Sequence, residues 1–390
     1  MRNKFNPYLQ IIGFALVAIV LVLDLISILS VDRGYSATEN RNLELRPELT
    51  LNTFMSGRYE EKYEDYTEDQ FPFRNLWIRV KTTSDRLVGK NESNGVYLCK
   101  SGYLIQNFND PKKENISETY AAIADFSERH SDLNQYAIIA PTAVTVHSDK
   151  LPKNAPVDDQ NAFIDEAATA FTAANVTFVD IRSHLEKAKE NNQIYYKTDH
   201  HWTTHGAYAA YKAFADEAGL TGKNLKYNKL LVSNSFQGTL SASSGFRMSA
   251  EDKIFIYMPK NNPVDYIVSY EEENIKTSSA YHTDNLEIRD QYTVFLNGNH
   301  SLIEISTLSE TRKSILVIKD SYANCFIPFL INDYSKIIVV DPRYYAGDID
   351  IVIKTEQIND VLYLYNASTF AEDANLKAVI RTPESEKTEE

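Results

Sequence analysis

Short, almost wholly apolar stretches recur in this chain, and most of them are followed by a segment with helical periodicity. Four of these stretches have the length of buried strands: "NQYAIIAPTAVTVH" from Asn134, "KSILVIKD" from Lys313, "KIIVVDPR" from Lys336 and "DVLYLYN" from Asp360. Their lack of polar alternation is typical of strands that are covered on both faces. Strands that alternate with helices predict a parallel sheet flanked by helices, so we expect an α/β fold.

Other segments depart from this alternation. Between about residues 225 and 310, runs such as "KIFIYMP" and "YTVFL" are typical of β structure with turns, so we expect a β-rich insertion there. Nearer the amino terminus, "NLWIRVKTTSDRLVG" predicts an amphipathic helix that ends at Gly89. The stretch from Asn94 to Ile105 contains a Lys-Ser-Gly turn between two apolar runs and predicts a hairpin.

The charge balance argues against nucleic acid as a partner. The chain of 390 residues carries 40 Lys and Arg against 54 Asp and Glu, a net charge of -14, whereas phosphate binding needs clustered positive charge. The two cysteines are too few for a disulfide framework or a zinc ribbon. We expect Cys325 to pack as a small apolar group, and whether it pairs with Cys99 stays open.

An apolar run from Leu9 to Leu29 has about the length that a helix needs to cross a bilayer. Its apolar residues can offset the cost of the one acid near its end, Asp24. Because Arg2 and Lys4 precede the run, the positive-inside rule puts the amino terminus in the cytoplasm and everything after about residue 32 outside. A cleaved signal peptide and a buried core helix are the alternatives. The length of the run and the lack of an A-x-A site after it favour an uncleaved single-pass anchor.

These segments divide the chain into four predicted parts. Residues 1–32 form a cytoplasmic stub and transmembrane anchor, 33–90 a juxtamembrane helical segment in which Pro72 breaks any helix, 91–378 the α/β domain with its insertion, and 379–390 a tail. The tail is charged and lacks apolar groups, so we expect it to be disordered.

Ser321 follows a predicted strand in "VIKDSYANCFIPF" and opens the next predicted helix. Strands of a parallel sheet deliver residues to the crevice beyond their carboxyl ends, and the free N–H groups at a helix start stabilise negative charge. A serine in this position would have an oxyanion site beside it. The alternative is that Ser321 is only the N-cap of that helix.

The stretch "YKTDHHWTTHGAYAAYKAF" places three of the chain's eight histidines beside Asp199. A serine nucleophile needs a base, and the usual base is a histidine that a carboxylate orients. Because residues i and i+2 of an extended segment point to the same side, Asp199 can reach Nδ1 of His201 and leave Nε2 free for Ser321. His200 would then point the other way, and Trp202 would pack beneath the pair or line the substrate groove.

Two alternatives compete with this triad. Asp199, His201 and His205 could hold a metal, since two histidines four residues apart on a helix resemble a zinc pair. That spacing requires a helix, however, and His201 is expected to precede the helix that begins near Thr203. The glutamate of an H-E-x-x-H motif is also missing. The other alternative is that these histidines cap a helix and have no chemical role.

The motifs "TDHHW" and "THGAY", with the downstream "KDSYA", resemble the DHHW family of alginate O-acetyltransferase-like SGNH hydrolases, the AlgX and AlgJ type. Further segments are similar to that family: "ATENRNLELRPELT", "DQFPFRNLWI", "GKNESNGVYLCKSGYLI" and "VFLNGNHSL". The resemblance covers most of residues 37 to about 345. It implies an SGNH-hydrolase-like parallel sheet flanked by helices, with the β-rich insertion and an amino-terminal transmembrane helix added.

The resemblance also implies Ser321 as the nucleophile, His201 as the base and Asp199 as the residue that orients the base. One departure is Lys319, which stands where the serine motif usually has glycine and puts the oxyanion geometry in question. For the oxyanion hole we further expect Asn299 in "LNGNH", because a side-chain amide is a suitable second donor beside the serine N–H. An ordinary turn residue is the alternative for Asn299.

The implied function is a membrane-anchored, extracytoplasmic O-acyltransferase, transferring acetyl, or an esterase, with a cell-surface polysaccharide as substrate and no cofactor or metal. Tyr322 and Trp202 would contribute to the substrate site. A partner membrane-bound O-acyltransferase would supply the acyl groups. The alternative is a non-catalytic glycan-binding or scaffold protein at the cell surface, which the 25 tyrosines also fit. Transferase and esterase differ in how well the site excludes water, so both stay open.

Overall fold

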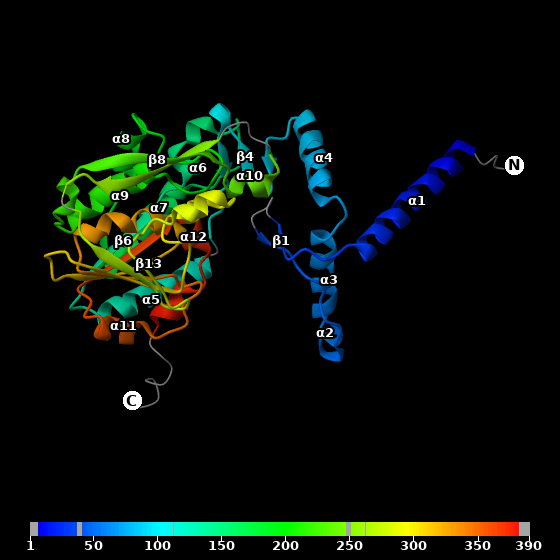
Figure 1. Cartoon of the computed structure of the whole chain (residues 1–390). Helices are drawn as coiled ribbons and strands as arrows, with labels where there is room; N and C mark the ends of the chain where they lie inside the picture. The colour runs from blue at the N-terminus through cyan, green and yellow to red at the C-terminus, as the bar shows by residue number, and fades with distance from the viewer. Residues whose placement is uncertain (1–6, 37–40, 112, 247–250, 262, 382–390) are drawn as a thin grey trace. The chain divides into compact units, whose positions relative to one another are not determined.

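The computed structural model describes residues 7–36, 41–111, 113–246, 251–261 and 263–381. The chain divides into two compact units, the first ending at Lys90 and the second starting at Asn91 (Figure 1). The predicted cytoplasmic stub before Pro7 and the predicted tail beyond Arg381 lie outside the described residues. The first residues of that predicted tail, up to Ile380, belong to a short helix.

The first unit begins with the helix α1 (Pro7–Leu29). Within it, the span from Gln10 to Leu29 has a mean hydropathy of 2.9 and is nowhere buried by the described residues, so by length and composition it could cross a membrane. The other elements are β1 (Tyr35–Ser36), β2 (Arg41–Asn42), α2 (Leu51–Met55), α3 (Arg58–Asp69) and α4 (Arg74–Leu87). The end of α3 before Pro72 and the end of α4 close to Gly89 agree with the sequence.

Within the described part of the second unit, eight strands form one mixed sheet. From edge to edge they are β11 (Ile275–Thr277), β10 (Tyr266–Tyr270), β12 (Leu302–Thr307), β14 (Lys336–Val340), β13 (Ser314–Lys319), β15 (Asp360–Asn366), β6 (Asn134–Ala140) and β7 (Thr177–Phe178). The strands from β14 to β7 are parallel, as the alternation of apolar and helical segments predicts. The strands β12, β10 and β11 are antiparallel.

The region that was predicted as an insertion is therefore partly built into the core. Only β8 (Tyr227–Phe236) and β9 (Asp252–Pro259) form an antiparallel ladder of their own. The strands β10 to β12 extend the central sheet because β12 pairs with β14, where Ile303 lies opposite Val339. Both of these side chains are completely buried, so the antiparallel strands add to the same apolar core.

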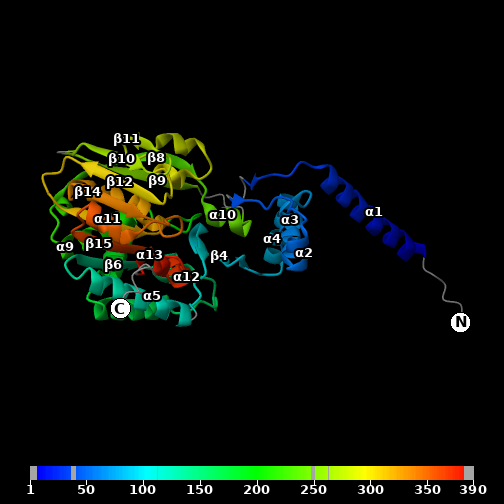
Figure 2. The same cartoon turned by 90° about the horizontal axis from the view of Figure 1, so that it is seen from below.

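Helices cover both faces of the sheet. Successive side chains of a strand point to opposite faces, and on β6 the ring of Tyr136 contacts Phe214 of α9 (Thr204–Glu217), whereas the amide of Gln135 donates to the backbone of α5 (Lys113–Arg129). In the view of Figure 1, α9 accordingly lies above the sheet and α5 below it. Figure 2 shows α5 beside α12 (Ala367–Glu372) and α13 (Leu376–Ile380).

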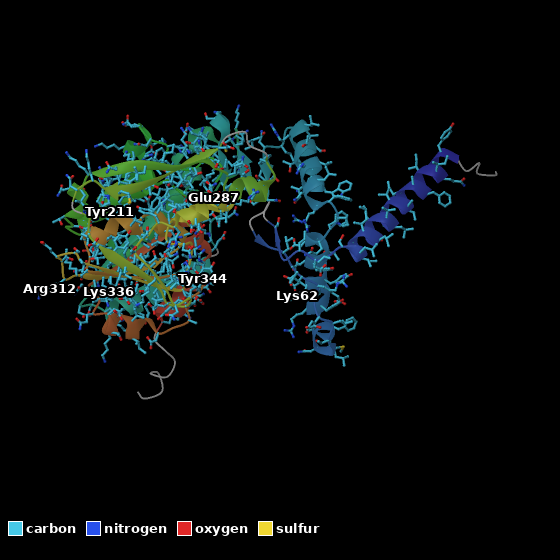
Figure 3. The ribbon with its side chains drawn as sticks, in the orientation of Figure 1. Lys62, Tyr211, Glu287, Arg312, Lys336 and Tyr344 are labelled. Carbon is cyan, nitrogen blue, oxygen red and sulfur yellow. The ribbon has the colours of Figure 1, made fainter. Side chains whose placement is uncertain are left out.

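Shorter elements complete the second unit, and β4 and β5 form the predicted hairpin. In chain order they are β3 (Glu92–Ser93), β4 (Val96–Leu98), η1 (Lys100–Gly102), β5 (Leu104–Gln106), α6 (Ala143–Val146), η2 (Ser148–Lys150), α7 (Gln160–Ala173), α8 (Arg182–Lys189), η3 (Gly222–Asn224), α10 (Thr239–Ser244), η4 (Thr283–Glu287), η5 (Gln291–Val294), η6 (Ser321–Cys325), η7 (Ile327–Asn332) and α11 (Ile349–Thr355), where η marks a 3₁₀ helix. Some buried polar groups of this unit pair across separate elements. Tyr211 of α9 (Figure 3) donates its hydroxyl to Asp333, for example.

His147, which is buried against the rings of Tyr103 and Tyr195, should make the fold sensitive to acid. Burial is the main cause that lowers the pKa of His147 to about 4. The unfolded chain, in which a histidine titrates near pH 6.5, therefore binds a proton first, and stability is lost as the pH falls from about 6.5 towards about 4. In urea titrations, His147→Leu should lose about 2 kcal/mol less of its free energy of unfolding than wild type does between about pH 7 and about pH 4.5. Equal losses in the two chains would contradict this expectation.

Candidate active site

The candidate site lies where several parallel strands end. β13 leads into Ser321, β14 leads into Asp341, and β15 ends at Asn366. The carboxyl ends of such strands form the crevice in which open α/β sheets bind ligands. Asn366 donates its backbone N–H and its side-chain amide to Asp320, which ties the end of β15 to the residue before Ser321.

Ser321, His201 and Asp199 meet in one hydrogen-bonded series. The Nε2 atom of His201 lies 2.7 Å from the Ser321 hydroxyl, and its Nδ1 atom lies 2.6 Å from Oδ1 of Asp199. Asp199 and His201 are buried, whereas Ser321 is partly exposed. Because a carboxylate can only accept, Nδ1 carries the proton and Nε2 accepts from the serine, which is the arrangement that a general base needs.

The carboxylate of Asp199 accepts hydrogen bonds on both sides. Oδ1 also accepts from the backbone N–H of His201, and Oδ2 accepts from the backbone N–H and the hydroxyl of Thr239. Burial alone would raise the pKa of Asp199. The rings of His201 and His200 and the hydrogen bonds from His201 outweigh burial and hold that pKa below its usual value. Asp199 is therefore a fixed negative charge beside the imidazole at neutral pH.

A second buried carboxylate holds the loop that precedes Asp199. Asp252, the first residue of β9, accepts from the backbone N–H groups of Lys197 and Thr198 and from the side chains of Thr198 and Gln193. Burial raises the pKa of Asp252, although these hydrogen bonds oppose the rise. The strands that the sequence sets apart as an insertion thus supply part of the support for the site.

Gly238 lies so close to Asp199 that a side chain there would disturb the series. A Cβ atom at position 238 would overlap with Cβ and Oδ2 of Asp199. The φ angle of Gly238 is -80°, so the close approach and not the backbone conformation requires glycine. Gly238→Ala should displace the carboxylate and lower kcat for ester hydrolysis by about 10²-fold. Gly34→Ala, where a Cβ meets only open space, is the matched control, and equal kcat values in the two variants would contradict the argument.

Ser321 is the first residue of η6 and is not its N-cap. Asp320 is the cap, since its Oδ1 accepts from the N–H of Tyr322. The N–H of Ser321 has no hydrogen-bond partner among the described residues, so it is available to an oxyanion. The α-helix that was predicted after the serine is instead two 3₁₀ helices, because Pro328 has no N–H to donate within a continuous α-helix.

A tight turn presents Asn299 near the end of β13. Leu296, Asn297 and Gly298 all have positive φ angles, of 54°, 57° and 93°. The region of Gly298 is one that glycine enters without steric cost. Asn299 follows this turn with an exposed side chain, as the turn in "LNGNH" indicates.

Lys319 points into the protein and not toward the serine. Its side chain is completely buried, and Nζ donates to Oδ1 of Asn299 at 2.9 Å and to Oδ2 of Asp341 at 3.0 Å. Burial lowers the pKa of Lys319, while Asp341 opposes that change. Asn324 also donates to Oδ1 of Asn299, so the amide NH₂ of Asn299 is turned away from both donors and has no described partner. The departure from the usual glycine thus fixes the orientation of the Asn299 amide.

The structure gives the positions of three residues around Ser321, His201 and Asp199 for which the sequence led to predictions, and one of these predictions, for His200, is wrong. Trp202 is completely buried and donates its Nε1–H to the carbonyl of Tyr322, so it takes the first of its two predicted positions, beneath the pair. Tyr322 is also buried and borders only a narrow recess. The ring of His200 does not point away: it packs on the ring of His201, with centroids 3.9 Å apart, because this segment bends where an extended one was assumed.

Sequence reasoning missed Tyr292, which contacts both His201 and Ser321. Its ring stacks on His201 with centroids 3.8 Å apart and an interplanar angle of 10°. Its hydroxyl donates to the backbone carbonyl of Ser321 at 3.0 Å and lies 3.3 Å from the sulfur of Cys325. Both Cys325 and Cys99 are buried free thiols, which answers the open question of their pairing.

The metal alternative built on Asp199, His201 and His205 is not supported. Nδ1 of His205 is bonded to the hydroxyl of Tyr257, and the described group with ligand atoms within 4.8 Å of one another contains His200 in its place.

Within that group, Nδ1 of His201 and both oxygens of Asp199 already bind other groups. Dialysis against EDTA should therefore leave ester hydrolysis unchanged, because these atoms have no free lone pair aimed at a common point. Loss of the activity on dialysis and its return with added Zn²⁺ would revive a metal site.

Residues 103–245 match a family model described as an SGNH hydrolase-like domain, acetyltransferase AlgX. The match contains Asp199 and His201 and ends before Asn299 and Ser321. Several similar curated proteins are named "Probable alginate O-acetylase AlgJ", among them one from Pseudomonas putida and one from Pseudomonas aeruginosa. The one from Pseudomonas putida is 24% identical over 194 residues, 47% of this chain and 49% of the relative. The one from Pseudomonas aeruginosa is 19% identical over 161 residues, 39% of this chain and 40% of the relative. The chain thus spans about half the length of the curated relatives it matches.

Two solved structures share the fold. A DHHW family protein from Eubacterium siraeum superposes with a TM-score of 0.65 and 24% identity, covering 75% of this chain and 98% of that chain. Bacillus cereus PatB1 with a sulfonyl adduct superposes with a TM-score of 0.60 and 21% identity, covering 74% of this chain and 100% of that chain. The second unit therefore has an SGNH-hydrolase-like fold, and residues 103–245 within it are similar to the SGNH hydrolase-like domain that the AlgX family model describes.

Proposed function

We propose that this chain is a serine O-acyltransferase or esterase of the SGNH type, with Ser321 as nucleophile, His201 as base and Asp199 as the residue that orients the base. The observation that carries the proposal is the series of two short contacts, 2.7 Å from Ser321 to Nε2 and 2.6 Å from Nδ1 to Asp199. The similarity of residues 103–245 to an acetyltransferase family supports the same class of reaction.

In the first half of the reaction, Oγ of Ser321 attacks the carbonyl carbon of an acyl donor while Nε2 of His201 takes the hydroxyl proton. The bond from the acyl carbon to the leaving oxygen breaks, and His201 returns the proton to that oxygen, leaving an acyl-serine. In the second half, a sugar hydroxyl or water gives its proton to Nε2 and attacks the acyl carbon. Ser321 then recovers the proton, and the acyl group leaves on the acceptor oxygen.

The negative charge that develops on the acyl oxygen needs donors. We propose the Ser321 N–H and the side-chain NH₂ of Asn299 for this role, because neither has a described partner and Lys319, the last residue of β13, holds the amide oxygen of Asn299 close to the end of that strand. Fixed donors of this kind stabilise the transition state without rearrangement during the reaction. Lys319 supports the arrangement by holding the amide oxygen of Asn299.

We further propose that the acyl acceptor is a cell-surface polysaccharide and that the acyl group is acetyl. The names of the AlgJ relatives support a polysaccharide O-acetylase. α1 would anchor the chain, with the amino terminus in the cytoplasm and the second unit outside, because Arg2 and Lys4 precede the apolar span. A membrane-bound O-acyltransferase is the proposed partner, since transfer outside the cell needs a supply of acyl groups across the bilayer.

Covalent labelling tests the nucleophile. The full chain in detergent is treated with phenylmethanesulfonyl fluoride and digested with trypsin, which releases a peptide from Asp320 to Lys336. We expect the sulfonyl group on Ser321 and none on Ser335, which lies in the same peptide and is an internal control. The Ser321→Ala chain should stay unlabelled in this peptide. A wild-type chain without an adduct on Ser321 would refute the proposal.

A further inference from the structure

A cleft of about 620 Å³ opens in the second unit next to His200. Distant parts of the chain form its walls: Asn94 and Val96 near the hairpin, Ser243 of α10, and the segment that contains α12. A narrow recess that also borders His200 leads from this region to Tyr322. The walls therefore bring together segments that the sequence places more than two hundred residues apart.

His200 and Thr239 connect the cleft to the triad. The ring of His200 packs on the ring of His201, and its Nδ1 lies 2.8 Å from the hydroxyl of Thr239. That hydroxyl is the same group that donates to Asp199. Since His200 and Thr239 both line the cleft, a molecule bound there lies one side chain away from the base.

Uncharged polar side chains are the most numerous in the cleft wall. Side-chain amides and hydroxyls come from Asn94, Gln106, Ser243, Ser368 and Asn375. Amides and hydroxyls both donate and accept, which matches the hydroxyl groups of a sugar. Apolar surface makes up a similar share of the wall, part of it from Val96 and Leu240.

The charges in the wall disfavour an anionic ligand. The one described cation of the lining, Arg343, is already held by both oxygens of Asp341, at 2.8 Å and 2.6 Å. His200 is uncharged at neutral pH, since burial beside His201 lowers its pKa to about 4. Glu372 and Asp373 add two carboxylates: that of Glu372 is exposed, whereas Oδ1 of Asp373 accepts from the backbone N–H of Asn375 and Oδ2 of Asp373 is buried. The described wall thus offers the accessible carboxylate of Glu372 and no free cation.

We propose that this cleft binds the acyl acceptor and takes an uncharged, hydroxyl-rich glycan in preference to a polyuronate. The inference rests on the proposed function and adds the substrate class to it. Each sugar of a polyuronate carries a carboxylate, which would meet the like charges of Glu372 and Asp373 without a partner. Sugar hydroxyls, by contrast, can donate to the exposed carboxylate of Glu372. The acceptor therefore differs from alginate, the polyuronate in the names of the AlgJ relatives.

Binding titrations with the full chain in detergent test this preference. The probes are hexasaccharides of glucose, mannose and N-acetylglucosamine, compared with a hexamannuronate at low salt. At least one neutral probe should bind at least ten times more tightly than the uronate. Binding of the uronate as tightly as the best neutral probe, or no binding of any neutral probe, would overturn the proposal.

Two variants and one control variant test whether the glycan binds in this cleft. Glu372→Lys reverses one charge of the wall and should raise the affinity ratio of uronate to neutral probe at least tenfold. Glu217→Lys makes the same charge change at the far end of α9, about 20 Å along the helix from its start, and should leave the ratio unchanged. Ser243→Trp fills the cleft from an exposed position and should weaken neutral binding at least tenfold. Equal ratios in both lysine variants, or unaltered binding by Ser243→Trp, would move the acceptor site elsewhere.

These results are separate from those that test the nucleophile. If the acceptor proposal is wrong, no neutral glycan binds more tightly than the uronate, while phenylmethanesulfonyl fluoride still labels Ser321. If the proposed function is wrong, Ser321 stays unlabelled whatever glycans the cleft binds.

Discussion

Ser321→Ala should lower kcat for the hydrolysis of 4-nitrophenyl acetate by at least about 10³-fold, because no other group can then form the acyl-enzyme. The aryl ester needs no help for its leaving group and no sugar acceptor, so the measurement isolates attack by the nucleophile. The methyl group of alanine leaves Nε2 of His201 facing a space that only water can fill. Residual activity would come from oxyanion stabilisation alone.

The matched control is Ser314→Ala, the same substitution at the opposite end of β13. The hydroxyl of Ser314 is buried and donates to the backbone carbonyl of Gln357, so its loss costs some stability and leaves the site untouched. We expect kcat of this control to equal that of wild type. Thermal unfolding curves would show whether both chains are folded. Equal rates for folded Ser321→Ala and wild type would contradict the proposed triad.

The hydrogen-bonded series of Ser321, His201 and Asp199 could be predicted because it follows from local rules. Asp199 and His201 are two residues apart, and Ser321 follows an apolar strand whose end lies at the binding edge of a parallel sheet. The rule that residues i and i+2 point to the same side gave the wrong orientation for His200, because this rule assumes an extended segment. In the structure the segment bends, and the carboxylate of Asp252 holds the residues before the bend.

The residues that support the triad carry no such local signal. Tyr292 comes from a short 3₁₀ helix, and Thr239 comes from a Ser-rich stretch that resembles any polar loop. Their contacts with His201 and Asp199 depend on which distant segments pack together. Which segments pack together depends on how the whole core is buried, and this cannot be derived from a short segment of sequence.

The central sheet also combines features that the sequence predicts with others that it does not predict. Its parallel strands are recognisable in the sequence as apolar stretches between helical segments, so their existence and direction are predictable. The alternating pattern of residues 302–307, by contrast, allows pairing within a separate β unit as well as with the main sheet. In the structure β12 lies against β14, where Ile303 and Ile305 complete the core. Pairing partners therefore cannot be read from periodicity alone.

Asp199→Asn should lower kcat for the same ester by about 10³- to 10⁴-fold while the chain stays folded. Both carboxylate oxygens of Asp199 accept from backbone N–H groups, one from His201 and one from Thr239. An asparagine must turn its NH₂ group toward one of them. If NH₂ faces His201, it favours the tautomer with the proton on Nε2, which cannot take the proton of Ser321. If NH₂ faces Thr239, the imidazolium still loses its negative counter-charge.

Asp333→Asn is the control that separates catalysis from folding. Asp333 is also a buried carboxylate, and it accepts from the hydroxyl of Tyr211 and the backbone N–H of Gly222, away from the strand ends that form the site. Both variants should lower the thermal unfolding midpoint, because each leaves a buried donor poorly paired. Only Asp199→Asn should lower kcat. A similar loss of kcat in both variants would mean that Asp199 acts through stability alone, and the imidazole of His201 would then need another source of its orientation.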